Sequence, residues 1–355
     1  MEKKIDDIIE DREHFLSSKI PSVSIAELDH DSIVIDVRTP EEYDNGHIPG
    51  AINIPLFNDE QRTIIGKIYK HQGKKNAINQ GYDYVEQNLN NFINQLVPYM
   101  NDKVVIYCAR GGMRSGSVTH LLMKLGGSNV LQLVGGYKFY RQHVLHFFET
   151  FSIKCIVLNG RTGTGKTEII NQLDHSIDLE GLAQHRGSLF GFIGRKPRNQ
   201  KTFEGLLYNE INKNFDHVFI EGESNKIGKV FIPKGLFEKM QKGVNILVTA
   251  PLEQRVQRIL NDYRFDNEEQ YTQIYQVIQS LKISLGKKKV DYLCDCLANN
   301  DLPDLVRTLL IEYYDPLYDH KIDNKEYALE VCSSNIFEAK KSLEKFKFRL
   351  KNRNE

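Results

Sequence analysis

The chain has 355 residues and a mass of 41.0 kDa, and 40% of its residues are hydrophobic, which suffices for two modest cores. Its 47 basic residues balance 47 acidic ones, which excludes a polycation that binds nucleic acid indiscriminately. No apolar run of about 18 residues occurs, and acidic residues stand where a signal peptide would be apolar. We therefore expect a soluble, cytoplasmic protein of two domains with no membrane partner.

The five cysteines argue against a stapled or zinc-bound fold. They are odd in number and contain no CxxC pair, so neither a disulfide framework nor a zinc cage is expected. They are Cys108, Cys155, Cys294, Cys296 and Cys332. Any special role for one of them must therefore come from its own surroundings.

Residues 1–150 alternate short apolar runs with helical segments, which is typical of a parallel α/β domain. A long polar insertion covers residues 58 to about 87. Strands are expected at 33–37, 104–107 and 130–134, and helices at 115–125 and from about 137 to 150.

The same pattern restarts at residue 153, and this restart alone marks the domain boundary near 150. We expect a second α/β domain over 151–310, with strands at 153–159, 217–221 and 244–248 and a helix from 166 to about 173. The chain reads mainly helical from residue 252 onward. Residues 311–355 are predicted to form a helical C-terminal extension, in which Ile336, Leu343, Phe346 and Leu350 recur near helical spacing.

The motif Cys108-Ala-Arg-Gly-Gly-Met-Arg114 directly follows a buried strand and precedes a helix. Backbone N–H groups and a helix N-terminus stabilise a thiolate, which is the reactive form of cysteine. Two glycines let the loop curl so that its amides face inward, and Arg110 and Arg114 add positive charge. This loop is predicted to hold an anion on or beside the sulfur. The predicted catalytic residues are Cys108, Arg110 and Arg114.

A second glycine-rich loop, Gly160-Arg-Thr-Gly-Thr-Gly-Lys-Thr167, lies between a strand and a helix, which is the context that a phosphate-binding P-loop requires. Its amides would surround a diphosphate, Lys166 would neutralise it, and Thr167 could bind Mg²⁺. The predicted diphosphate-binding residues are Gly160, Arg161, Thr162, Gly163, Thr164, Gly165, Lys166 and Thr167. The loop recognises diphosphate and not the group attached to it.

Two further regions contain candidate site residues. Residues 185–201 hold five basic side chains and no acid, interleaved with glycine and phenylalanine, which favours a loop that approaches phosphate or a base. The candidates for tRNA or diphosphate contacts are His185, Arg186, Arg195 and Arg198; a solvated basic loop is the alternative. Glu221 ends a predicted strand, and Glu221 and Glu223 are candidates for an acid or Mg²⁺ site. Glu180 and Glu223 are candidates for anchoring these loops or for binding Mg²⁺.

The first half resembles the rhodanese family. The resemblance rests on Asp36-Val-Arg38, Glu41-Glu-Tyr43, Gly46-His-Ile-Pro-Gly-Ala-Ile-Asn-Ile-Pro55, the cysteine loop and Val134-Gly-Gly-Tyr137. It implies that Cys108 carries a chalcogen as a persulfide does. Cys108 and Arg114 also have the C-x5-R spacing of cysteine phosphatases, but Tyr107 stands where those enzymes usually have His.

Two more blocks resemble the tRNA 2-selenouridine synthase family, in which a rhodanese domain precedes a P-loop domain. They are residues 178–191 and 221–228. The segment Gly66-Lys-Ile-Tyr-Lys70 in the insertion also resembles this family. The resemblance implies exchange of the sulfur of wobble 2-thiouridine in tRNA for selenium from selenophosphate, through an S-geranylated base made from geranyl diphosphate. The P-loop would then hold the prenyl donor, and Cys108 would accept or guide selenium.

The resemblance also implies co-substrates and partners. Selenophosphate and geranyl diphosphate would be co-substrates rather than tightly bound cofactors, and whether Mg²⁺ is also required is left open. A selenophosphate-supplying enzyme could be a partner.

From the residues alone two other functions stay open: an ATP-gated persulfide sulfurtransferase, and a rhodanese-fold phosphatase fused to a small-molecule kinase. The latter would use Arg255 and Arg258, which lie at helical spacing after Pro251, as lid arginines.

Overall fold

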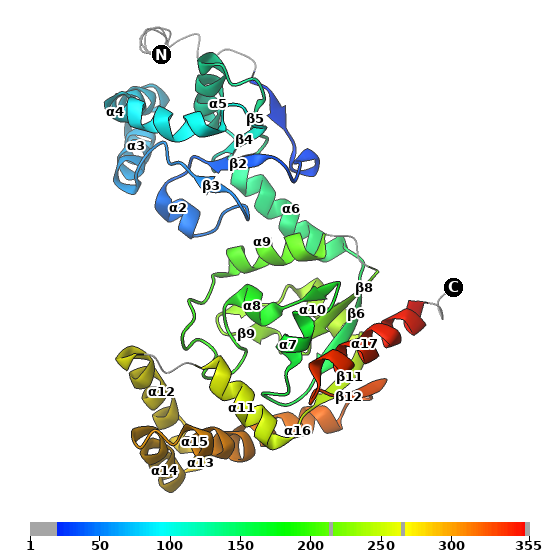
Figure 1. Cartoon of the computed structure of the whole chain (residues 1–355). Helices are drawn as coiled ribbons and strands as arrows, with labels where there is room; N and C mark the ends of the chain where they lie inside the picture. The colour runs from blue at the N-terminus through cyan, green and yellow to red at the C-terminus, as the bar shows by residue number, and fades with distance from the viewer. Residues whose placement is uncertain (1–19, 213–215, 264–266, 352–355) are drawn as a thin grey trace. The chain divides into compact units, whose positions relative to one another are not determined.

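The computed structural model describes residues 20–212, 216–263 and 267–351 (Figure 1). The chain forms two compact units that divide between Phe147 and Phe148, inside helix α6. Over the described ranges, no helix is both long enough and apolar enough to cross a membrane.

The first unit is built on a sheet of five parallel strands in the order β1-β5-β4-β2-β3. The strands are β1 (Ser22–Val23), β2 (Ile33–Asp36), β3 (Ile52–Asn53), β4 (Val104–Tyr107) and β5 (Val130–Leu133). The central strand β4 is buried along its whole length, as its unbroken apolar run requires in a parallel sheet covered on both faces. The Cys108 loop begins at the carboxyl end of this central strand.

The helices of the first unit are α2 (Pro40–Asp44), α3 (Asp59–Gln72), α4 (Lys74–Leu96), α5 (Met113–Leu125) and α6 (Gly136–Thr150), with 3₁₀ turns at Ile25–Glu27 and Val97–Tyr99. The expected polar insertion is thus a helical hairpin of α3 and α4. Asn58 caps α3 by accepting a hydrogen bond from the Gln61 N–H at 2.8 Å. Gly73 reverses the chain between the helices with φ of +87°, which favours glycine.

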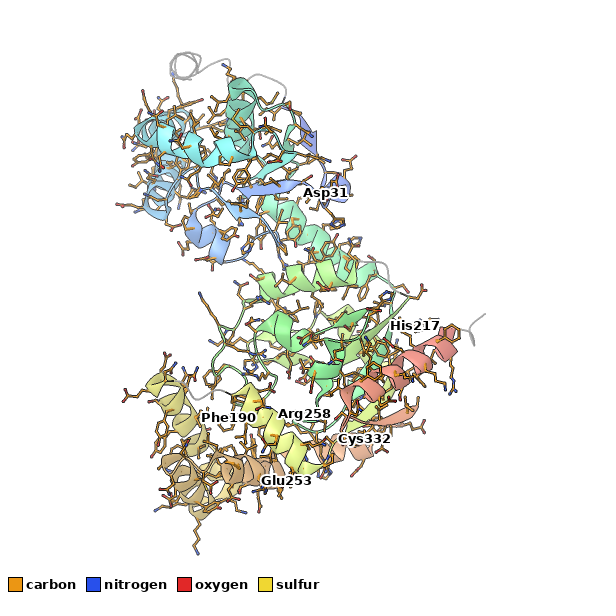
Figure 2. The ribbon with its side chains drawn as sticks, viewed as in Figure 1. Asp31, Phe190, His217, Glu253, Arg258 and Cys332 are labelled. Atoms are coloured by element: carbon orange, nitrogen blue, oxygen red, sulfur yellow. The ribbon has the colours of Figure 1, made fainter. Side chains whose placement is uncertain are left out.

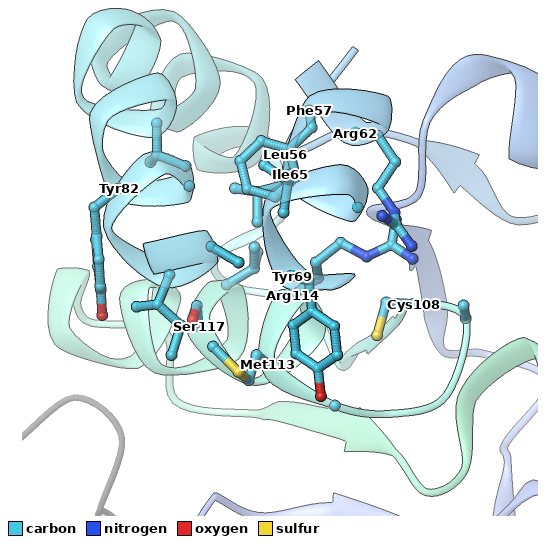
Figure 3. Close-up of a pocket in the computed structure, with 18 of the residues that line it drawn as sticks. Leu56, Phe57, Arg62, Ile65, Tyr69, Tyr82, Cys108, Met113, Arg114 and Ser117 are labelled. Atoms are coloured by element: carbon cyan, nitrogen blue, oxygen red, sulfur yellow. The ribbon is translucent and has the colours of Figure 1, made fainter. Parts of the chain in front are cut away.

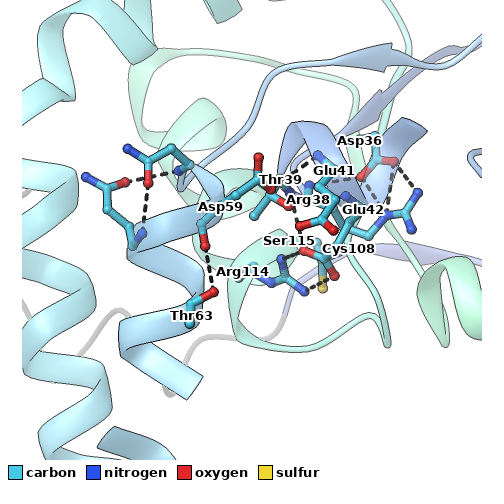
Figure 4. Close-up of polar contacts among 12 residues, drawn as sticks. Asp36, Arg38, Thr39, Glu41, Glu42, Asp59, Thr63, Cys108, Arg114 and Ser115 are labelled. Carbon is cyan, nitrogen blue, oxygen red and sulfur yellow. Dashed lines mark hydrogen bonds and ion pairs between the residues drawn. The ribbon is translucent and has the colours of Figure 1, made fainter. Parts of the chain in front are cut away.

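The core of the first unit joins its sheet to α4 and α5. Buried Ile35 and Ile106 from the sheet contact Ile93 of α4 and Leu122 of α5 within one apolar cluster. A buried ion pair lies at the end of β2, where the Arg38 Nη2 is 2.6 Å from an Asp36 carboxylate oxygen. The Asp36-Val-Arg38 motif therefore orders the fold beside the cysteine loop (Figure 4).

The second unit contains a parallel five-stranded sheet in the order β12-β11-β6-β8-β7 and a short antiparallel hairpin of β9 and β10. The strands are β6 (Lys154–Asn159), β7 (Ser176–Ile177), β8 (His217–Glu221), β9 (Lys226–Ile227), β10 (Val230–Phe231), β11 (Val244–Thr249) and β12 (Leu329–Cys332). The P-loop follows the central strand β6, and β8 places Glu221 opposite Leu158. The order of the strands therefore brings Glu221 next to the P-loop.

The helices of the second unit cover the sheet and then form a helical region. They are α7 (Lys166–Ile170), α8 (Leu179–Ala183), α9 (Gln200–Ile211), α10 (Lys234–Gln241), α11 (Leu252–Asp262), α12 (Glu268–Ser280), α13 (Lys282–Leu285), α14 (Lys287–Ala298), α15 (Leu302–Leu309), α16 (Asp315–Asp323) and α17 (Ile336–Lys351), with a π-helical turn at Leu310–Tyr314. One apolar cluster joins Phe190 and Ile193 to helices α11 to α15.

A helical extension was expected over 311–355, and the described part of it, residues 311–351, contains a strand as well as helices. Strand β12 pairs in parallel with β11 and so belongs to the sheet of the second unit. Helix α17 is amphipathic as predicted, and it buries Leu343 and half-buries Ile336, Phe346 and Leu350 against the sheet. A four-residue strand that contains an exposed glutamate has too little apolar pattern to be recognised in the sequence. Figure 2 shows Cys332 at the end of β12 and Arg258 on α11.

Candidate functional sites

The Cys108 thiol is buried, with 4% of the residue exposed, at the start of the loop that leads into α5. The Ser115 hydroxyl lies 3.2 Å from Sγ and donates to it (Figure 4). Burial disfavours the thiolate, but the Ser115 hydroxyl, the Arg110 N–H and the Arg114 charge outweigh it and lower the pKa of Cys108. The loop therefore stabilises the Cys108 thiolate relative to that of an ordinary cysteine.

Two residues that support this thiol were not identified from the sequence. Ser115 accepts a hydrogen bond from Gln132 Nε2 at 2.8 Å, and the same amide donates to the Gly112 carbonyl at 3.0 Å. The Ser115 hydroxyl has two acceptors within reach, Cys108 Sγ at 3.2 Å and the Gly112 carbonyl at 3.3 Å, and Gln132 holds the serine oxygen beside both. Gln132 lies on β5, far from Cys108 in the chain, and only the pairing of β5 with β4 brings it near.

The loop is also shaped by glycines from two segments. Gly111 and Gly136 have φ of +60° and +55°, and their backbones approach closely. A side chain on Gly136 would place Cβ 2.2 Å from the Cys108 carbonyl oxygen and 2.5 Å from the Gly111 nitrogen. The Val134-Gly-Gly-Tyr137 motif is thus required by contact with the cysteine loop.

The arginines of the loop differ in their surroundings. Arg110 is exposed, whereas Arg114 makes a two-pronged ion pair with Glu42 at 2.6 and 3.1 Å (Figure 4). Although burial raises it, the pKa of Glu42 is held below its usual value by Arg114. Arg62 of α3 adds a further cation near Sγ, and burial and the charge of Arg114 lower the Arg62 pKa. Neither Glu42 nor Arg62 was predicted as a site residue.

A cavity of about 660 Å³ opens beside Cys108 and is lined mostly by apolar side chains (Figure 3). The α3–α4 hairpin and α5 form its walls, and the cysteine loop closes one end. Its volume lies within the roughly 300–1,000 Å³ of small-molecule sites. The first unit therefore joins a stabilised thiolate to an apolar cavity.

In the second unit the P-loop has the backbone that its motif predicts. Gly163 and Gly165 have φ of +77° and +78°, and a side chain on either would press on α11 at Arg255 or Arg258. The Thr164 carbonyl accepts a hydrogen bond from Ser333, which follows β12. The Lys166 ammonium donates to the carbonyls of Gly160 at 3.0 Å and Arg161 at 3.4 Å. The Lys166 side chain therefore folds back onto the loop whose bound diphosphate it is predicted to neutralise.

Carboxylates crowd around Thr167, which is the first polar side chain of α7 after Lys166. The Thr167 hydroxyl donates to Glu221 at 2.6 Å and lies 3.4 Å from Glu180. Burial and the neighbouring carboxylates of Asp178 and Glu223 raise the pKa of Glu221 to about 8. Burial, Glu221 and Glu223 likewise raise the pKa of Glu180 well above its usual value. Negative charge at this cluster is costly until a cation balances it.

This donor set fits a P-loop Mg²⁺ site only in combination with a ligand. Within the described part of the chain, no three His, Cys, Asp or Glu side chains are grouped so that they alone could hold a metal ion. Mg²⁺ commonly takes one or two carboxylates together with a hydroxyl and substrate phosphates. Thr167 with Glu221 and Glu180 supplies the protein share of such a set.

The arginines near the P-loop are engaged by acids. Arg255 is buried and bonds both carboxylate oxygens of Asp315, while it also donates to the Thr162 carbonyl at 2.9 Å. Arg161 lies 2.7 Å from Asp319 and 3.8 Å from Asp315. These ion pairs connect the P-loop to α16, and Arg255 of α11 contacts both elements.

The predicted basic loop is irregular between α8 and α9, as its glycines suggest, but two of its arginines bind main-chain carbonyls of the protein itself. Arg186 donates to the carbonyls of Ile193 and Asp262 and stacks over Tyr263, with 4.4 Å to the ring centre. Arg198 donates to the carbonyls of Gly181 and Leu182.

His185 and Arg195 complete the predicted set. His185 is buried between Gly191 and Gly228, and burial together with the Arg195 charge lowers its pKa. Arg195 is half-buried. His185, Arg186 and Arg198 thus order the loop, and their contacts with tRNA or diphosphate stay predictions.

Fold and site geometry together define a class of protein: a rhodanese-like domain with a thiolate loop, followed by a P-loop domain with a helical C-terminal part. A family model described as "Rhodanese-like domain" matches residues 24–143, and one described as "tRNA 2-selenouridine synthase AAA domain" matches residues 153–347. The chain belongs to the tRNA 2-selenouridine synthase family.

Relatives named tRNA 2-selenouridine synthase match both units. That of Sulfurovum sp. is 31% identical over 325 residues, which are 82% of this chain and 88% of the relative. That of Hydrogenovibrio crunogenus is 32% identical over 329 residues, or 84% and 91% of the two chains. That of Nitrosomonas europaea is 37% identical over 246 residues, or 66% and 64%. Among solved structures, the N-terminal domain of a putative ATP/GTP binding protein from Clostridium difficile 630 is 49% identical, with a TM-score of 0.33 over 35% of this chain and 98% of that chain.

Proposed function

We propose that the protein replaces the sulfur of wobble 2-thiouridine in tRNA with selenium from selenophosphate, through an S-geranylated base made from geranyl diphosphate. The name of its relatives supports selenouridine synthesis. The observation that carries the prenyl step is the character of the space beside the P-loop, which is apolar.

That space is a small slot of about 60 Å³ between the P-loop and the helical region of the second unit. Thr162 lies at the loop, and the walls come from side chains such as Phe190, Ile274, Tyr263 and Leu309. A nucleoside needs hydrogen-bonding partners for its base and sugar, whereas a prenyl chain needs only apolar contact. The first carbons of a chain whose diphosphate lies on the P-loop would enter this slot, and α12 and α15 would have to separate for the rest.

In the first step the thiocarbonyl sulfur attacks C1 of geranyl diphosphate, so that the S–C1 bond forms and the C1–O bond breaks, and the base loses its N3 proton to water. Pyrophosphate leaves with the electron pair, and the loop amides with Lys166 and Arg161 stabilise its growing charge. Thr167, Glu221 and Glu180 would hold Mg²⁺, which would supply further charge neutralisation. Lys166 would release the loop carbonyls in order to contact the phosphate.

In the second step selenium of selenophosphate attacks C2 of the base and geranyl thiol leaves with a proton. Water then cleaves the Se–P bond, which yields 2-selenouridine and phosphate without any oxidant or reductant. The N–H groups of the Cys108 loop with Arg110 and Arg114 counter the charge of selenophosphate, and Cys108 guides the selenium. S-alkylation is needed because a thiocarbonyl sulfur is a poor leaving group.

The test is incubation of the purified protein with 2-thiouridine tRNA, geranyl diphosphate, selenophosphate and Mg²⁺, followed by mass spectrometry of the nucleosides. We expect both S-geranyl-2-thiouridine and 2-selenouridine. Rapid ATP hydrolysis without either nucleoside would instead support an ATP-gated sulfurtransferase.

A further inference from the structure

We propose that the cavity beside Cys108 binds the prenyl chain of the S-alkylated tRNA base while its C2 atom reacts at the cysteine loop. This inference rests on the proposed function, because it concerns the second step of that reaction. It assigns a ligand to the α3–α4 hairpin, for which the sequence provided no role.

The cavity is built from three helical faces. On α4 the lining residues recur at helical spacing, as do those on α3 and α5, so each helix turns one stripe toward a common space. The principal apolar members are Ile65, Ile78, Val85, Leu89, Val118 and Leu121. Gly81 also lies in the lining, where a Cβ would stand in van der Waals contact with the Phe57 ring at 3.4 Å.

Charged groups gather beside the thiol at one end of this space, and the lining also includes Lys74 and Glu86. Figure 3 shows the Cys108 sulfur and the guanidinium groups of Arg62 and Arg114 together at one end, with Tyr82 at the other. An apolar cavity in a folded protein stays dry and takes up apolar ligands. The lining therefore suits an amphiphile whose polar head lies at Sγ and whose tail extends between α3, α4 and α5.

Covalent connection decides which amphiphile this is. In an S-geranylated base the chain is attached through sulfur to the same C2 atom that selenium must attack. When C2 lies at the Cys108 loop, the chain must begin within a few bond lengths of Sγ, and the cavity is the apolar space that borders Sγ. The geranyl thiol released when the C2–S bond breaks would leave through the same cavity.

The decisive experiment compares two leaving groups in single-turnover displacement by selenophosphate. One anticodon stem-loop RNA carries S-geranyl-2-thiouridine and the other carries S-methyl-2-thiouridine, which needs no cavity. Val85→Phe fills the space from α4, and Gln87→Phe is the matched control at an exposed position of the same helix. We expect Val85→Phe to slow the geranyl substrate by about tenfold and to leave the methyl substrate and the Gln87→Phe variant within about twofold of wild type.

The outcomes separate the inference from the proposed function. Equal slowing of both substrates by Val85→Phe, or slowing of neither, would overturn the cavity assignment. Failure of the wild-type protein to release geranyl thiol from the S-geranyl RNA would instead overturn the proposed reaction. If Val85→Phe blocked alkylation by geranyl diphosphate rather than displacement, the cavity would hold the donor and not the alkylated base.

A binding measurement provides an independent check. The chain contains no tryptophan, and Tyr69 is an exposed residue at the cavity, so Tyr69→Trp introduces a single fluorescent reporter there. We expect geraniol to shift its emission to shorter wavelength in a saturable way, and Val85→Phe to weaken that binding. An unchanged spectrum at all geraniol concentrations would contradict the assignment.

Discussion

The two loops that follow central strands differ in how ready they are for chemistry. The Cys108 loop already holds its thiol by Ser115 and Gln132, and a 660 Å³ cavity borders it. The P-loop instead folds Lys166 onto its own carbonyls and buries Glu221 among other carboxylates. The first site is pre-organised around one atom, whereas the second needs the charges of a ligand and a cation to reach its working state. The predictions below test this contrast.

The largest effect is expected from removal of the thiol. Cys108→Ala should reduce selenouridine formation by about 10²- to 10³-fold while S-geranylation stays near wild type, because the thiolate that guides the selenium acts in only one of the two steps. Nucleoside mass spectrometry measures both products, and Cys155→Ala is a buried-cysteine control. Equal loss of both products would show that the loops do not divide the reaction.

Lys166→Ala should weaken geranylation by about 10- to 100-fold, as expected for one charged hydrogen-bonding group to the diphosphate. Displacement of a preformed S-geranyl base by selenophosphate should be unchanged. Lys154→Ala, an exposed lysine at the start of β6, is the control. Impaired displacement in Lys166→Ala would place selenophosphate, rather than the prenyl donor, on the P-loop.

Ser115→Ala should slow alkylation of Cys108 by iodoacetamide at pH 7 by about fivefold, the effect of losing one net hydrogen bond. The loop lowers the pKa of Cys108, so wild-type reactivity should rise at lower pH than that of an ordinary thiol, and the variant profile should move to higher pH. Peptide mass spectrometry follows Cys108 alone, with Ser117→Ala as the control. Superimposable profiles would mean that the hydroxyl does not stabilise the thiolate.

The smallest effect concerns stability. The pKa of Glu221 is raised to about 8, so this carboxyl costs stability as the pH rises from its unfolded value, about 4.3, through 8. With EDTA present, Glu221→Gln should therefore raise Tm by about 2–4 °C at pH 8.5 and by little at pH 5. Exposed Glu330→Gln should change neither value. A lower Tm for Glu221→Gln at pH 8.5 would show that the carboxylate is stabilised without a cation.

Local patterns predicted much of the fold because the central strands are continuous apolar runs. The expected strand at 104–107 matches β4, and the one at 217–221 matches β8. The two-residue strands and β12 were missed, since their pairing depends on neighbours distant in the chain. The α3–α4 hairpin was missed as well, because its sequence is largely polar and its apolar stripe is broken by Gly66 and Gly81.

The candidate sites divide in the same way. Cys108 and Lys166 could be predicted because a loop motif places each beside its own amides. Gln132 and Glu42 reach their sites from other elements, so their roles depend on sheet order and helix placement that no local motif encodes. Glu180 was a candidate from the sequence, and the structure places it 3.4 Å from the Thr167 hydroxyl. For the same reason Arg186 and Arg198 looked free in the sequence but donate to main-chain carbonyls in the fold.

The central claim is that alkylation precedes selenium transfer on one base. The most direct measurement is a time course of nucleosides from 2-thiouridine tRNA in excess protein with selenophosphate, run with and without geranyl diphosphate. The account predicts that S-geranyl-2-thiouridine rises first and decays as 2-selenouridine appears, and that neither forms without geranyl diphosphate. Formation of 2-selenouridine at the same rate without geranyl diphosphate would contradict it.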